Sequence, residues 1–144
     1  MPDELSHIRQ AKHCQATIDH LFIRKESFHD WIAVVAFYKA LHLVEAMFAC
    51  NPEIGHGRNH EFREDWLKRE RRYAHIWNNY RPLWEAATIA RYLENHGTKI
   101  STFAAYMTFE EVQSRILNHH LHQIEQSVKK FLTAKAQEEL ASIV

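Results

Sequence analysis

Glycine, proline and cysteine are scarce in this chain, and their scarcity excludes several architectures. The 144 residues include three glycines and three prolines, which is too few for the many tight turns of a β-sandwich or barrel. The two cysteines, Cys14 and Cys50, lie in apolar segments of helical character. We expect them to be buried free thiols in a reducing compartment, since a disulfide framework needs more cysteines.

Net charge and long apolar runs are also missing. Eighteen basic and eighteen acidic residues give a formal net charge of zero, so an anion must be attracted by a local patch and not by a global field. The longest apolar run, residues 31–38, is too short to cross a bilayer. The first residues lack the basic and apolar regions of a signal peptide. We therefore expect a cytoplasmic protein with no membrane partner.

Hydrophobic residues make up 46% of the chain and recur at helical spacing. They are enough for the core of one domain, residues 1–144. The pattern predicts an all-α, up-and-down bundle of four to five helices. The expected helices cover residues 3–24, 27–49, a segment from 59, a segment from Pro82 to Gly97, and 108 to about 132, with a loop at 98–107.

Polar residues at the predicted helix starts are typical N-caps. Ser27 and Asn59 precede apolar periodic segments, and Thr108 with Glu111 forms a capping box. The last helix carries a long apolar stripe that continues to residue 132. Its length exceeds the need of a small bundle, so we expect part of it to pack on a second copy in a homodimer.

Residues 54–63 gather cationic and titratable side chains at the start of a helix. His56, Arg58, His60 and Arg63 fall within eight positions, in a turn that also holds two of the three glycines. The free amides and the dipole at a helix N-terminus add to the attraction for an anion. We predict that a phosphate group, alone or in RNA, binds here. A solvated loop with ordinary surface charge is the alternative.

The apolar helix before this turn carries a polar ladder of Tyr38, His42 and Glu45. These residues are four and three positions apart, so they share one helix face. A buried glutamate requires a cation or a proton donor, which Arg58 or Arg63 would supply. We expect the ladder to support the anion site. The alternative is a core polar network that fixes the register of the helix.

Aromatic residues and arginines are adjacent twice more, at Tyr80–Arg81 and Arg91–Tyr92. Such side chains stack on bases or ribose and contact phosphate. An ordinary helix end with amphipathic side chains produces the same pattern. The candidate binding residues are therefore His56, Arg58, Tyr80, Arg81 and Tyr92.

Twelve histidines are several times the usual number. Most stand singly on polar helix faces, as at His7, His13 and His20, and adjacent histidines such as His119 and His120 point in different directions on a helix. We therefore expect no metal and no cofactor. One alternative remains, because His42, His56 and His60 resemble the metal-binding triad of DinB-like four-helix bundles, which would hold Zn²⁺ or Ni²⁺.

One pattern joins the ladder, the turn and the aromatic pairs. It reads Trp31-x6-Tyr38-x2-Leu41-His42-x2-Glu45, then His56-x-Arg58-x-His60-x2-Arg63, then Tyr80-x2-Leu83 and Ala90-Arg91-Tyr92. This pattern covers roughly residues 28–95, about half of the chain, and resembles small bacterial HEPN-domain proteins. The resemblance implies a dimerising helical bundle. It implies either a metal-independent endoribonuclease of a toxin–antitoxin or defence module, with an antitoxin as partner, or a non-catalytic interaction module.

The resemblance also implies a catalytic pair, an arginine followed after four to six residues by a histidine. Arg91 and His96 fit this spacing, although Tyr92 departs from the polar residue that often follows the arginine. The same spacing occurs at Arg24–His29, Arg69–His75 and Arg115–His120. The alternative pair is His60 with Arg63 or Arg58 at a helix start. There arginine would stabilise a phosphorane and histidine would move a proton.

Overall fold

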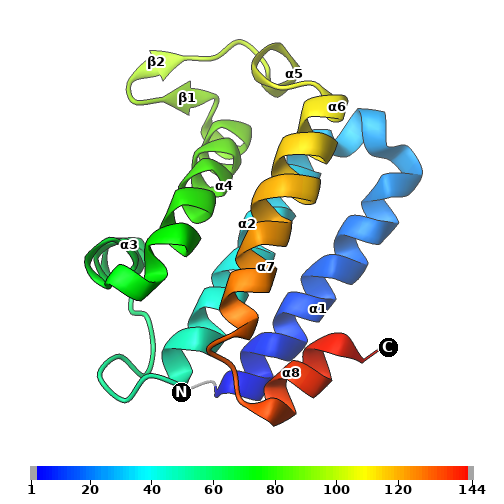
Figure 1. Cartoon of the computed structure of the whole chain (residues 1–144). Helices are drawn as coiled ribbons and strands as arrows, with labels where there is room; N and C mark the ends of the chain where they lie inside the picture. Colours follow the sequence, from blue (N-terminus) through cyan, green and yellow to red (C-terminus); the bar gives the residue numbers. More distant parts are fainter. Residues whose placement is uncertain (1–2, 143–144) are drawn as a thin grey trace.

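The structure, a computed structural model, describes residues 3–142 as an antiparallel helical bundle (Figure 1). Three long helices, α1 (Glu4–Leu21), α2 (Lys25–Ala49) and α4 (Ala74–Tyr92), run alternately up and down. The fourth long segment joins α6 (Phe109–Glu111), the π-helical η3 (Val112–Leu121) and α7 (His122–Lys129) end to end. The prediction of an all-α up-and-down bundle is confirmed.

Shorter elements connect and flank the four long segments. A turn of 3₁₀ helix, η1 (Phe22–Arg24), joins α1 to α2, and α3 (His60–Arg69) with η2 (Arg71–Tyr73) precedes α4. An antiparallel hairpin of β1 (Glu94–Asn95) and β2 (Thr98–Lys99) follows α4, and α5 (Phe103–Tyr106) follows the hairpin. The last element of residues 3–142 is α8 (Ala134–Ala141), which packs against α1, so α1 begins and α8 ends at the same end of the bundle.

The central element is α2, because it is apolar on most of its circumference. It contacts α1, α4, η3 and α7. An 18-residue window within Glu4–Ala49 has a mean hydropathy of 1.6, enough by length and composition for a membrane-crossing helix, and 72% of that window is buried inside the bundle. The central position of α2 brings its polar ladder close to α1 on one side and to α3 on the other.

Two of the predicted caps are confirmed. The Asn59 side chain accepts a hydrogen bond from the Phe62 amide at the start of α3, and Thr108 and Glu111 form a reciprocal capping box. The apolar stripe of the last long segment is buried within the chain, at Val112, Ile116, Leu121, Ile124, Val128 and Leu132. Other helices of the same chain therefore cover these residues, and the length of the stripe is no longer an argument for dimerisation through it.

Other helix boundaries differ from the prediction. Pro82 lies inside α4 and not at its start. The turns before it are helical because Ile76 and Tyr80 are completely buried, and this packing outweighs the loss of one N–H group. Ser27 does not cap α2, which begins at Lys25 and is kinked at Phe28. The helix α8 is absent from the prediction, whose last helix runs on to residue 132.

Residues 93–107 contain more structure than the predicted loop. Leu93, with φ at 52°, ends α4, so Gly97 is not the C-cap of that helix. Instead His96 (φ 50°) and Gly97 (φ 84°) form the two-residue turn between β1 and β2. Positive φ at both positions is what a type I′ hairpin turn requires.

Candidate functional site

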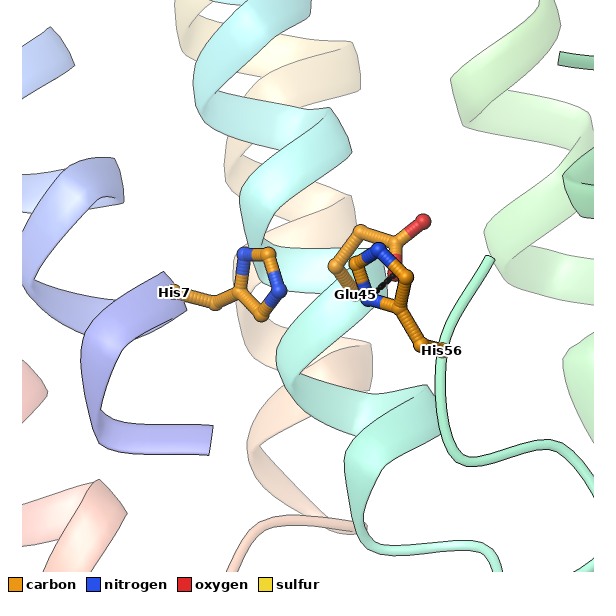
Figure 2. Close-up of side chains that lie close together, drawn as sticks. All are labelled: His7, Glu45 and His56. Carbon is orange, nitrogen blue, oxygen red and sulfur yellow. Dashed lines mark ion pairs between the residues drawn. The ribbon is translucent and has the colours of Figure 1, made fainter. Parts of the chain in front are cut away.

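Five polar residues from four segments meet in the interior beside α2. His7 comes from α1, His42 and Glu45 from α2, His56 from the turn at residues 50–59, and Arg63 from α3. We call these five residues the His–Glu cluster. Figure 2 shows three of them, with the rings of His7 and His56 and the carboxylate of Glu45 facing one another.

Glu45 is the centre of the cluster and only 1% exposed. Its Oε1 accepts a hydrogen bond of 3.1 Å from Nη1 of Arg63, and its Oε2 accepts one of 2.8 Å from the Gly57 amide. The Nδ1 atom of His56 lies 3.1 Å from the same Oε2. The predicted counter-charge is therefore supplied by Arg63, whose side chain is only 13% exposed, and not by Arg58.

Gly57 lets the turn approach the buried carboxylate. A Cβ atom at this position would overlap Oε1 of Glu45 and lie 2.9 Å from Cγ of Arg63. Every other amino acid has a Cβ, so a substitution here must push the turn away from Glu45. The glycine thus keeps His56 and the Gly57 amide in contact with the carboxylate.

His7 and His42 extend the cluster towards α1. Their Nδ1 atoms are 3.0 Å apart, and His7 is 6% exposed with its ring stacked on that of His56 at 5.5 Å between centroids. Burial lowers the pKa of His7 and lowers the pKa of His42 to about 4. Both rings are neutral at pH 7, so one Nδ1 donates to the other.

Unpartnered buried atoms are concentrated around this cluster and beside it. In residues 3–142, six buried side-chain nitrogen or oxygen atoms lack a hydrogen-bond partner. Five of them belong to neighbouring residues on α1, α3, α4 and the turn: His7 Nε2, His56 Nδ1, His60 Nδ1, Arg63 Nε and the Tyr80 hydroxyl. Buried polar atoms are normally paired, so this concentration marks the place where a ligand, ion or water is most strongly favoured.

His60, the first residue of α3, is held by aromatic rings from α4. Its ring stacks on Trp84 at 4.4 Å and on Tyr80 at 6.4 Å between centroids. Burial lowers the pKa of His60, and the charges of Arg63 and Arg91 act in the same direction. Tyr80 is 0% exposed, and burial raises its pKa to about 12. In this conformation the Tyr80 ring is covered and lies beneath His60 as a support, so it offers no exposed face for stacking on a base.

Arg91 lies among exposed aromatic side chains near the end of α4. Its Nη1 donates to the Tyr38 hydroxyl at 3.3 Å and its Nε to the Ala87 carbonyl. The guanidinium lies 6.0 Å from the Tyr38 ring centroid and 5.2 Å from that of Tyr92. Within the described residues no carboxylate lies within ion-pair distance of Arg91, whereas Arg63 is neutralised by Glu45.

Trp31 extends this exposed aromatic surface along α2. Trp31 lies seven residues before Tyr38, which places both side chains on one helix face about two turns apart. Both are exposed, as is Tyr92. We call Trp31, Tyr38, Arg91 and Tyr92 the aromatic platform.

The remaining predicted residues lie elsewhere. Arg58 is exposed, with its guanidinium over the Phe62 ring. Arg81 and His96 both face Glu85, at 3.7 and 3.6 Å. Arg91 and His96 therefore contact different neighbours, and no hydrogen bond or ion pair joins them in residues 3–142. His96 lies in the hairpin turn that follows the end of α4.

The DinB-like triad is not brought together either. His60 stacks on Trp84, while His42 contacts His7. The group of potential ligands that the described residues do bring within 4.8 Å of one another is His7, Glu45 and His56. The prediction that His7 lies on a polar helix face is wrong: it is 6% exposed, because its place beside the buried Ile8 puts it at the edge of the apolar face of α1.

Comparison with known proteins identifies no relative: protein-family models, curated proteins and solved structures all fail to match the chain. The function must therefore be argued from the chemistry of the site.

Proposed function

We propose that the protein is a HEPN-like helical protein that binds RNA or another phosphate-bearing ligand on the aromatic platform and the adjoining start of α3. The observation that carries the proposal is the environment of Arg91. Arg91 has no carboxylate partner in residues 3–142 and is held beside two exposed tyrosines, so it offers a charge for phosphate and ring faces for bases. Single-stranded RNA is bound by this combination of stacking and cationic contacts.

The placement of the motif residues supports the HEPN-like part of the proposal. The residues that carry the resemblance lie on α2, the 50–59 turn, α3 and α4, and they contact one another through Glu45–Arg63, His60–Tyr80 and Tyr38–Arg91. A pattern that is spread over residues 31–92 in the sequence thus occupies one side of the bundle. Membership of a toxin–antitoxin or defence module, with an antitoxin partner, belongs to the same proposal and rests on the resemblance.

Metal-independent RNA cleavage is the finer form of the proposal, with His60 as the proton-transfer residue. Its lowered pKa keeps the ring neutral at pH 7, as a general base requires. The charge of Arg91, which acts on this ring, would also act on a phosphorane bound beside it. Without cleavage, the same surface serves a non-catalytic interaction module.

Binding is tested by fluorescence anisotropy with a labelled single-stranded RNA, in EDTA and at several salt concentrations. Arg91→Ala should weaken binding at least tenfold and reduce the salt dependence by about 0.7 in log K per log salt, the value for one phosphate contact on a single strand. The matched control is Arg71→Ala, because Arg71 is exposed and lies in η2, just before the start of α4, which is about 25 Å from Arg91 along the helix. Equal binding by both variants would refute the proposal.

Cleavage is tested with the same RNA in EDTA. If His60 transfers the proton, His60→Gln abolishes cleavage and retains binding, while His13→Gln, a change at an exposed position on α1, has no effect. Loss of cleavage in His96→Gln with full activity in His60→Gln would assign the reaction to Arg91 and His96. Intact RNA after incubation with the wild-type protein would leave the binding module as the function.

A further inference from the structure

We propose that His7, Glu45 and His56 bind a single transition-metal dication such as Zn²⁺ or Co²⁺. The three residues come from α1, α2 and the 50–59 turn, and one ligand atom of each lies within 4.8 Å of the others. This inference goes beyond the proposed RNA binding, which uses the aromatic platform and is measured in EDTA.

The donor set fits such an ion. Two imidazoles and one carboxylate are a set that zinc uses in catalytic sites, where three protein ligands leave a fourth position open. Metal–ligand distances of about 2.0–2.2 Å place tetrahedral ligand atoms roughly 3.3–3.6 Å apart. Oε2 of Glu45 and Nδ1 of His56 are already 3.1 Å apart, so a small movement of His7 completes the geometry.

His7 presents an unpartnered ring nitrogen to the other two ligands. Its Nδ1 contacts His42, and its Nε2 is buried without a hydrogen-bond partner. In Figure 2 the ring nitrogen of His7 that points towards Glu45 and His56 is the one not bonded to the ring carbon that carries the side-chain stem, so it is Nε2. When Nδ1 of His7 donates to His42, Nε2 carries a lone pair for the ion. Metal-bound histidines are commonly oriented by such a second hydrogen bond.

His56 and Glu45 are close but not paired by a good hydrogen bond. Nδ1 of His56 is buried without a hydrogen-bond partner despite its short distance to Oε2, because the angles are poor. Two atoms that bind the same ion are arranged in this way, because the lone pair of each points to the ion and not to the other ligand. The Gly57 amide holds Oε2 in place, while Arg63 takes the other oxygen.

The neighbouring charges define the fourth ligand. Glu45 contributes one negative charge, and Arg63 already balances it at 3.1 Å. A bound dication therefore leaves an excess of positive charge in a buried place, which favours an anionic fourth ligand such as hydroxide or phosphate. The His56 side chain is 26% exposed. The fourth ligand position is therefore separated from solvent by the 50–59 turn and not by a packed helix.

The experiment is a Co²⁺ titration of protein that carries no histidine tag and has been stripped with EDTA. Visible absorption reports coordination, and Zn²⁺ competition reports affinity. We expect one Co²⁺ per chain with a dissociation constant in the micromolar range or below. His56→Gln and His7→Gln should weaken binding at least tenfold, and His42→Gln about tenfold through the orientation of His7. The matched control is His13→Gln, an exposed position on the same helix as His7, which should bind like the wild type.

Two results would overturn the inference. One is the absence of saturable binding at one ion per chain in the wild-type protein. The other is unchanged affinity in His56→Gln, which would assign the bound metal to surface histidines. His56 lies on a turn, so this variant decides the question even if circular dichroism shows that His7→Gln does not fold. RNA binding is measured in EDTA, so its outcome is independent of the outcome of the metal titration.

Discussion

Replacing Glu45 by glutamine tests whether the His–Glu cluster stabilises the fold through its ion pair. The substitution keeps the shape of the side chain and one oxygen that accepts from the Gly57 amide. It removes the charge that faces Arg63 at 3.1 Å. The buried guanidinium then loses its only ion-pair partner among the described residues. We therefore expect Glu45→Gln to be strongly destabilising.

The magnitude follows from the burial of the pair. Removal of one member of a buried ion pair costs about 3–5 kcal/mol. Arg63 retains some exposure, at 13% of its side chain, and the glutamine amide keeps part of the hydrogen bonding. The expected loss is therefore at the lower end, about 3 kcal/mol. For a chain of this length a thermal midpoint falls by about 3 °C per kcal/mol, so the midpoint should drop by about 9 °C.

The assays are thermal unfolding and urea unfolding in EDTA, both followed by far-ultraviolet circular dichroism. The slope of the urea transition is expected to stay unchanged. Glu138→Gln is the matched control, because Glu138 is exposed on α8, and it should change the free energy of unfolding by less than about 0.5 kcal/mol. Adding Arg63→Met to Glu45→Gln should cost less than the two single changes together, with a coupling of about 1–3 kcal/mol. A Glu45→Gln protein as stable as the control would refute this account of the ion pair.

Two further predictions concern pH and oligomeric state. His42 has a folded-state pKa lowered to about 4 from 6.5, so the unfolded chain binds more protons between these values. The urea midpoint should therefore fall as pH drops from about 6.5 towards 4, and His42→Gln should flatten this dependence. Exposed apolar side chains outside the aromatic platform, among them Ile23 and Phe28, leave a surface for a second copy. Light scattering at micromolar concentration should report about twice 17.1 kDa, and a mass of one chain would contradict the homodimer.

Contacts between residues close in sequence were predictable, because one helix start or one turn determines them. The caps at Asn59 and Thr108 involve residues three positions apart. The contact of Glu45 with Arg63 follows from a short turn that returns the chain to the helix it has just left. The amphipathic periodicity likewise predicts the all-α class, since apolar faces must be buried against one another.

Contacts that depend on how whole helices pack were not predictable from the same signals. His7 meets His42 only because α1 and α2 pair in one particular register. Tyr80 is a buried support because α4 presents that face to α2 and α3. His96 contacts Glu85 from a hairpin turn because the helix ends at Tyr92 and the chain then reverses at Gly97. Spacing in the sequence carries no information on these three outcomes.

The hydrogen bond from Gly57 to Glu45 has a kinetic consequence. Gly57 is buried although the next two residues of the turn are exposed. Its amide proton can exchange with solvent deuterium only when the turn separates from α2. The same opening uncovers Glu45 and the inner face of His7. Deuterium exchange at this single amide therefore measures how often the His–Glu cluster opens to bulk solvent. The rate of this opening limits how fast an ion that enters by this route is gained or released.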